Sequence, residues 1–295
     1  MAQKPLVSVG IPTYKRTDGL KRTLACMQAQ TYENVEIIVS DNNASVPDID
    51  PIIDPIIRQD ERIHYFKQKE NIGSEANFLF VLQKASGKYF MWAADDDLWN
   101  NFFIDELVKL LEREQGNLIA ANFEAQYVDD NNNPFGFFPE GRPFYDFESN
   151  DAVKRLKHIL AHNYGNLIYS LYRREIFDKC DPIFVKNEIP LFLQAASYGN
   201  WKVLPDVGFS KRTTMATYRQ AKWEKSGGIL IRPLVPIRQL GYIYTYHKKT
   251  IGNIELSIDT LNINRSEARL LKAFAGKKIW AHFTWLVLGY KPKPR

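Results

Sequence analysis

Short apolar runs alternate with helical stretches along the first part of the chain. Residues 6–12 (LVSVGIP) and 35–40 (VEIIVS) are rich in β-branched side chains, and residues 17–30 between them place apolar side chains at helical spacing. The same pattern predicts further strands at 63–66, 89–92 and 118–123, with helices at 74–86 and 104–114. This alternation predicts an α/β fold with a mostly parallel central sheet and helices on both faces.

Two features divide the chain beyond this point. Residues 129–139 (DDNNNPFGFFP) are rich in turn residues and predict a loop or a hairpin. Residues 211–295 carry 17 Lys and Arg against 4 Asp and Glu, whereas the whole chain has 39 against 34. We therefore predict an α/β domain at 1–210 and a basic, largely helical extension at 211–295. The extension either contacts an anionic partner or presents a solvated basic face.

Composition narrows the class of protein. With 295 residues, 45% hydrophobic and 25% charged, the chain has globular proportions that exclude disordered and fibrous classes. Its two cysteines, Cys26 and Cys180, show neither metal-binding nor disulfide-framework spacing. The N-terminus enters an apolar run directly and shows no signal-peptide pattern, so we expect a cytoplasmic protein.

Polar segments follow four of the predicted strands. They are residues 12–16 (PTYKR), 41–43 (DNN), 71–73 (NIG) and 95–97 (DDD). Ligands of open α/β sheets bind at the carboxyl ends of the strands, so we expect these segments to converge on one crevice.

Three consecutive carboxylates at 95–97 follow an apolar strand and precede a helix. Their mutual repulsion favours a bound cation, and hard oxygen ligands suit Mg²⁺ or Mn²⁺ held together with substrate phosphates. The alternative is a solvated loop in which an aspartate caps the helix.

The motifs PTYKR, VSDNNAS, NIGSEANF and ASGKYFMWAADDD occur in this order between residues 7 and 99. This stretch resembles the nucleotide-sugar-binding half of family 2 inverting glycosyltransferases of GT-A fold, of the type that assembles bacterial surface polysaccharides. The resemblance implies a Rossmann-related mixed sheet, and a GT-A nucleotide-sugar-binding and catalytic domain at 1–210.

The resemblance also implies roles for residues. Tyr14 would lie against the nucleobase and Asp41 would accept a hydrogen bond from its edge, which suits uracil. Asp97, with Asp95, would hold Mn²⁺ or Mg²⁺ at the diphosphate. The nucleotide-sugar contacts it implies are Pro12, Thr13, Tyr14, Arg16, Asp41, Asn71, Gly73, Asn77, Asp95 and Asp96.

This chain departs from the family pattern at two places. Many relatives have Arg or Lys where Ala76 stands, so phosphate neutralisation would depend on the metal or on a base such as Arg219 or Lys222. The usual acidic pair is replaced by Asn187 and Glu188, which leaves Glu188 as the candidate general base. The alternative for Glu188 is an exposed first-turn residue that interacts with the helix dipole.

The expected reaction is a single in-line displacement, with inversion, from a nucleoside-diphosphate sugar to an acceptor hydroxyl. The chain lacks the GxSxG, P-loop and GxGxxG signatures. Two alternatives stay open: a non-catalytic nucleotide-sugar binder or scaffold, and a nucleotidyltransferase that forms sugar nucleotides. Nucleic-acid binding is not expected, because an acidic crevice would repel a phosphate backbone.

The end of the chain, residues 277–295, places aromatic side chains between basic flanks. Its apolar stretch is too short to span a bilayer but suits a helix lying on anionic lipid. We therefore expect peripheral contact with the inner face of the cytoplasmic membrane and a glycan or lipid-linked acceptor. The alternative is a terminal helix that docks on the core.

Overall fold

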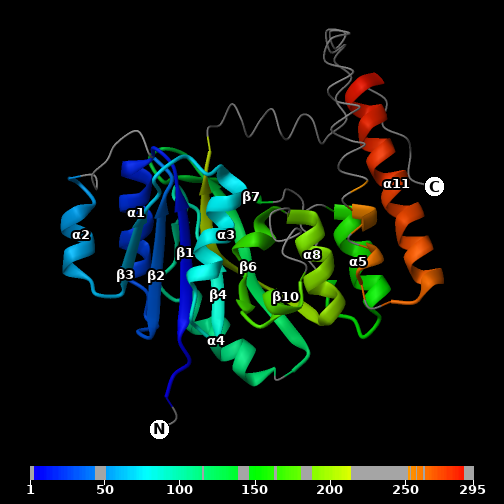
Figure 1. Cartoon of the computed structure of the whole chain (residues 1–295), viewed down its shortest axis with the longest axis horizontal. Coiled ribbons are helices and arrows are strands. Elements are labelled where there is room, and N and C mark those ends of the chain that lie inside the picture. Colours follow the sequence, from blue (N-terminus) through cyan, green and yellow to red (C-terminus); the bar gives the residue numbers. More distant parts are fainter. Residues whose placement is uncertain are drawn as a thin grey trace.

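A single mixed sheet forms the centre of the molecule (Figure 1). The structure is a computed structural model that describes residues 3–43, 51–114, 116–138, 146–162, 165–180, 188–213, 252, 254–256, 258–261 and 263–288. The strands are β1 (Val7–Thr13), β2 (Val35–Asp41), β3 (Ile63–Lys67), β4 (Tyr89–Trp92), β5 (Leu98–Trp99), β6 (Leu118–Val128), β7 (Pro134–Phe138), β8 (Asp146–Phe147), β9 (Leu171–Arg173) and β10 (Asn200–Arg212). The helices are α1 (Thr17–Gln28), α2 (Asp54–Gln59), α3 (Ser74–Lys84), α4 (Phe103–Arg113), α5 (Ala152–His162), the 3₁₀ helix η1 (Gly165–Tyr169), α6 (Ile176–Lys179), α8 (Glu188–Tyr198) and α11 (Arg265–Leu288).

The sheet is parallel where the sequence alternation is clearest. Its order is β3-β2-β1-β4-β9-β6-β10-β5, with β7 beside β6 and β8 beside β10. The pairs β3/β2, β2/β1, β1/β4 and β6/β10 are parallel, whereas β9 joins the two halves through antiparallel pairs with β4 and β6. The predicted α/β fold with a mixed sheet is confirmed, and the turn-rich segment forms a hairpin from β6 into β7.

The sheet separates two apolar cores. Residues 7, 9 and 11 of β1 face the core beneath α1 and α4, where α4 contributes Phe103, Leu107 and Leu111. The opposite core lies beneath α3, α5 and α8 and includes Trp92, Trp201 and Phe192. Because both faces are covered, every residue of β1 is buried, which explains its nearly continuous apolar sequence.

The helix α11 lies at the edge of the molecule opposite α1 and α2 and packs against α5 (Figure 1). Its inward side includes Leu271 and Ala275, which belong to the core beneath α5 and α8. Within the described residues no helix combines the length and apolarity that crossing a bilayer requires. The last strand β10 continues to Arg212, so a division of the chain after residue 210 would fall inside the sheet; the division into two domains remains a prediction.

Candidate functional site

The loop after β1 is tied to the triple aspartate. The Thr13 hydroxyl donates to Asp95 Oδ2 at 2.8 Å. Arg16 Nη1 lies 3.3 Å from Asp95 Oδ1 and also forms an ion pair with Asp96. Burial raises the pKa of Asp95, although the hydroxyl of Thr13 and the charge of Arg16 oppose this effect. The carboxyl ends of β1 and β4 are thereby joined at one point.

Eight of the predicted nucleotide-sugar contacts line one open hollow of about 390 Å³. Within this hollow Tyr14 is 44% exposed, and the neighbouring Lys15 has φ 57°, a conformation uncommon for residues other than glycine. The hollow has the size of a small-molecule site. The eight contacts are Pro12, Thr13, Tyr14, Arg16, Asn71, Gly73, Asn77 and Asp95.

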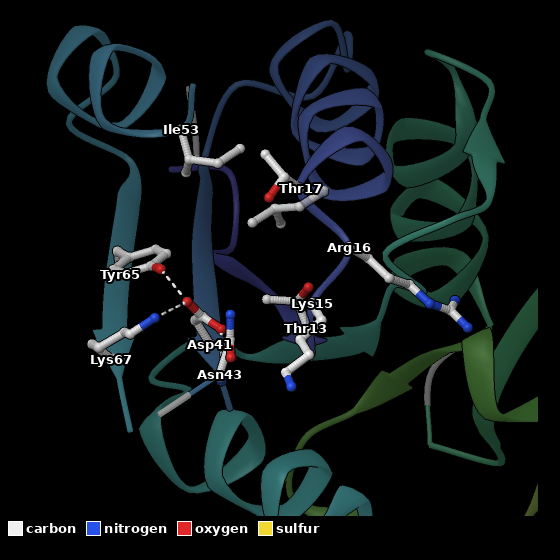
Figure 2. Close-up of a pocket in the computed structure, with 10 residues that line it drawn as sticks. Thr13, Lys15, Arg16, Thr17, Asp41, Asn43, Ile53, Tyr65 and Lys67 are labelled. Carbon is white, nitrogen blue, oxygen red and sulfur yellow. Dashed lines mark hydrogen bonds and ion pairs between the residues drawn. The ribbon is translucent and has the colours of Figure 1, made fainter. Parts of the chain in front are cut away.

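Asp41 lines an adjacent, smaller pocket of about 40 Å³ at the end of β2 (Figure 2). Its Oδ2 accepts hydrogen bonds from the Tyr65 hydroxyl and from Lys67 Nζ, both at 2.6 Å, and Oδ1 accepts the Asn43 backbone N–H at 2.9 Å. Burial alone would raise the pKa of Asp41, but the bonds from Lys67 and Tyr65 outweigh it and hold that pKa below its usual value. Asp41 is therefore a carboxylate with a partner cation already in place.

Tyr65 and Lys67 were not among the residues that the sequence predicted for the site. A signal for them exists, because residues two apart on a strand point to the same face and Lys67 is paired in register with Asp41 across β2 and β3. From the expected pairing of β2 with β3, the sequence could have predicted that Lys67 lies beside Asp41.

The Asn77 side chain forms hydrogen bonds with the carboxyl ends of β1 and β2. Its Oδ1 accepts a hydrogen bond from Ser40 Oγ at 2.6 Å, and its Nδ2 donates to the carbonyl oxygens of Ser40 and Thr13 at 3.1 and 3.3 Å. Asn71 has a similar place, because Asn42 Nδ2 donates to its Oδ1 at 2.8 Å. These hydrogen bonds hold Asn71 and Asn77 in place where they line the hollow.

Asp97 is the most deeply placed carboxylate of the three and is 3% exposed. Its Oδ1 accepts the Arg212 backbone N–H at 3.3 Å, whereas Oδ2 is buried and has no hydrogen-bond partner. Burial raises the pKa of Asp97 to about 6, and the charge of Lys211 limits the rise. Lys211 Nζ lies 3.6 Å from Oδ2, a distance that gives an ion pair and exceeds hydrogen-bond range.

A buried carboxylate oxygen without a hydrogen bond is a fitting place for a cation. The described residues contain no group of three or more His, Cys, Asp or Glu side chains arranged to hold a metal ion. A divalent ion at Asp97 Oδ2 would therefore take most of its other ligands from water and from a bound phosphate, as Mg²⁺ commonly does.

Glu188 begins α8 and has an exposed side chain. The surrounding protein still desolvates the carboxyl enough to raise its pKa, and Lys211 opposes this rise. Tyr169 is partly buried: its desolvation raises its pKa, and the negative charges of Asp97 and Glu188 raise it further. Asn187, Arg219 and Lys222 lie outside the described residues.

The mixed sheet, the acidic loop after β4 and the hollow at the ends of the parallel strands define an α/β protein of GT-A-like class. Residues 8–180 match the family described as glycosyl transferase family 2, and the chain belongs to this family. Its fold is similar to that of S. aureus TarS residues 1–349, with a TM-score of 0.62 at 14% identity over 95% of this chain and 72% of that one. TarS 1–349 has also been solved in complex with UDP and with UDP-GlcNAc.

Curated relatives match only part of their own length. The chain is 26% identical over 58% of its length to an uncharacterized glycosyltransferase of Rickettsia typhi, covering 52% of that protein. It is 35% identical over 32% of its length to the Campylobacter jejuni GalNAc(5)-diNAcBac-PP-undecaprenol beta-1,3-glucosyltransferase, covering 30% of it. A putative teichuronic acid biosynthesis glycosyltransferase of Bacillus subtilis is 33% identical over 37% of this chain and 42% of its own length.

Proposed function

We propose that this chain is a metal-dependent inverting glycosyltransferase that moves a sugar from a UDP-sugar to an acceptor hydroxyl. The observation that carries the proposal is the convergence of Asp41, Asp95 and Asp97 at the carboxyl ends of β2 and β4, beside a hollow open to solvent. The UDP and UDP-GlcNAc complexes of TarS, which has a similar fold, support a nucleotide-sugar ligand. Membership of family 2 favours sugar transfer over the formation of sugar nucleotides.

Asp41 and Lys67 supply the chemistry that recognises a uracil edge. A carboxylate accepts about four hydrogen bonds. Tyr65, Lys67 and Asn43 account for three, so Asp41 can still accept one from an imide N–H. The Lys67 ammonium retains donors for the carbonyl beside that N–H. Cytosine offers an acceptor at the matching ring nitrogen and would meet the carboxylate unfavourably.

Asp97 and Asp95 would hold the divalent ion, and Thr13 and Arg16 orient Asp95 for this task. When bound, such an ion stabilises the negative charge that develops on a departing diphosphate. Arg16 is the described cation nearest the hollow and would contact the diphosphate from the loop after β1.

Glu188 would accept the proton of the acceptor hydroxyl. Its raised pKa moves it toward neutral pH, where a general base is effective. Attack from the face opposite the leaving group then inverts the anomeric centre without a covalent enzyme intermediate. Asn187, which stands at the first position of the usual acidic pair, lies outside the described residues.

The names of the relatives support an acceptor in polysaccharide biosynthesis, including one built on a polyprenyl diphosphate. An interfacial contact through residues 277–295 would bring the crevice to such an acceptor at the inner face of the cytoplasmic membrane. The backbone of this segment is helical to Leu288, and residues 289–295 lie outside the described part of the chain.

The experiment that tests transfer compares Glu188→Gln with the unsubstituted chain. We expect UDP release from a panel of UDP-sugars, in the presence of Mn²⁺, to fall at least about a hundredfold in the variant, within the range of general-base contributions. UDP affinity should stay within about twofold. Equal turnover in both proteins would refute Glu188 as the base. Binding of UDP-sugars with no turnover in either protein, across the panel and with glycan acceptors, would favour the non-catalytic binder.

A further inference from the structure

Lys211 lies beside the candidate metal ligand Asp97, and its charge acts on the candidate base Glu188. Its ammonium is 3.6 Å from Asp97 Oδ2, and its positive charge also lowers the pKa of Glu188. Lys211 belongs to β10, where its backbone pairs in register with Tyr127 of β6. The sheet therefore presents this side chain at the same edge as the triple aspartate.

The position opposite Asp97 Oδ2 is where a divalent ion would bind. The Arg212 backbone N–H holds Oδ1, so the carboxylate cannot turn freely and Oδ2 is the oxygen left for a cation. In the metal-free protein Lys211 supplies the positive charge that this buried oxygen needs, but at a distance beyond hydrogen-bond range. The ammonium compensates the charge of Asp97 as an ion pair.

Tyr169 offers the ammonium a second favourable surface. Lys211 Nζ lies 4.7 Å from the centroid of the Tyr169 ring, and this ring makes edge contacts with the stacked rings of Trp99 and Phe209. A cation over the face of an aromatic ring is attracted by the ring's electrons, so the ammonium keeps a favourable contact while it changes partner.

The charges around the site indicate that Lys211 would leave Asp97 and approach the diphosphate when both ligands bind. Arg16 pairs with Asp95 and Asp96, and Lys211 pairs with Asp97, so each of the three carboxylates already has an internal cation. A divalent ion at Asp97 would repel a nearby ammonium, whereas a diphosphate brings new negative charge to the crevice. Entry of both ligands together would move the ammonium from the carboxylate toward the phosphates.

We propose that Lys211 is an exchangeable counter-cation: it neutralises Asp97 in the empty crevice, yields that place to the divalent ion, and then binds the diphosphate of the donor. This inference rests on the proposed function, because it assumes that a metal ion and a nucleoside diphosphate bind at Asp97. It assigns to Lys211 the phosphate-neutralising charge that Ala76 cannot provide.

Mn²⁺ titrations followed by electron paramagnetic resonance test the first half of the proposal without requiring activity. We expect Lys211→Met to bind Mn²⁺ alone at least about fivefold more tightly than the unsubstituted chain, because the competing ammonium is gone. Lys202→Met is the matched control, because Lys202 lies on the same strand and pairs with Glu148 away from the site. It should leave Mn²⁺ affinity unchanged.

Calorimetric titration of UDP at saturating Mn²⁺ tests the second half. We expect Lys211→Met to weaken UDP binding at least about tenfold, as expected for loss of a charged hydrogen bond. Equal or weaker Mn²⁺ affinity in the variant would overturn the competition, and unchanged UDP affinity would overturn the transfer to the diphosphate. If Lys211→Met has a lower melting temperature than the unsubstituted chain, Lys211→Gln replaces it in both titrations. If the unsubstituted chain itself binds no UDP with Mn²⁺, the proposed function fails instead.

Discussion

In the folded protein the Asp97 carboxyl has a pKa of about 6, compared with 3.8 for an ordinary aspartate. The folded chain therefore binds this proton more tightly than the unfolded chain does. The stability that the protonated group contributes is complete below about pH 4 and is lost as the pH rises through about 6. At neutral pH the charged, buried carboxylate destabilises the metal-free fold by up to about 3 kcal/mol.

Asp97→Asn should remove this pH-dependent penalty. In chelator, we expect the variant to exceed the unsubstituted chain in free energy of unfolding by about 2–3 kcal/mol at pH 7.5, and by much less at pH 4. Urea denaturation at the two pH values measures the difference. A stability gap of the same size at both pH values would show that the ionisation of Asp97 does not cause it.

Lys67 is the residue through which base recognition can be separated from metal binding. Lys67→Met removes a 2.6 Å contact to Asp41, in a pair that is largely buried, and should weaken UDP binding about tenfold. Tyr65→Phe, which removes a neutral donor to the same oxygen, should weaken it less. Titration of both variants with UDP and Mn²⁺ gives the comparison; a larger loss in Tyr65→Phe would contradict the assigned role of Lys67.

At the scale of elements, the sequence predicted those whose hydrophobic pattern is set by burial on both faces. β1 to β4 and the helices α1 and α3 lie within one or two residues of their predicted bounds, whereas β6 ends later than predicted, at Val128, and the short helix α2 was not predicted. The short strands β5, β8 and β9 were missed, because two or three residues carry no period and their strand form depends on distant partners. β10 also contains register shifts, which interrupt the alternation that would have identified it.

The packing of α1 against the aspartate loop depends on Gly19. A Cβ at this position would lie 2.3 Å from the Asp95 carbonyl oxygen, so a larger residue must displace the loop that carries the carboxylates. We expect Gly19→Ala to lower the free energy of unfolding by about 1–3 kcal/mol and to weaken UDP binding.

Gly276→Ala is the matched control for this substitution. Gly276 also lies in a helix, and among the described residues no atom lies within 4 Å of its Cβ position. Here alanine should stabilise the helix by up to about 1 kcal/mol. Thermal melts of the two variants distinguish close packing from a general effect of alanine, and a loss of stability in both would contradict the packing argument.

At the scale of the whole molecule, the sequence located the acidic side of the site better than its basic side. The aspartates follow β2 and β4, which flank β1 in the parallel part of the sheet, so their convergence could be inferred. Lys211 meets Asp97 only because β10 pairs with the short strand β5, where Ser210 lies opposite Leu98, and no local pattern connects residues so far apart. Tyr169 escaped notice for the same reason, since it reaches the site from η1.

The uneven distribution of charge leads to a prediction about membranes. If residues 277–295 lie on anionic lipid, reversing Lys291 and Lys293 to Glu should lower binding to phosphatidylglycerol vesicles at least about tenfold, since each basic residue contributes about 1 kcal/mol. Reversal of Lys21 and Lys69, both exposed on the sheet domain, is the control. Vesicle sedimentation measures this; equal binding by both double variants would assign the contact to another surface.

The central claim is that the crevice at the ends of β1, β2 and β4 binds a uridine diphosphate with a divalent ion at Asp97. Calorimetric titration of UDP, CDP and GDP into the unsubstituted chain and into Asp97→Ala, with Mn²⁺ and with chelator, tests it most directly. We expect UDP to bind the unsubstituted chain with Mn²⁺, to lose this binding with chelator and in Asp97→Ala, and CDP to bind much more weakly than UDP. Absence of nucleotide binding by the folded chain, or UDP binding indifferent to both changes, would contradict it.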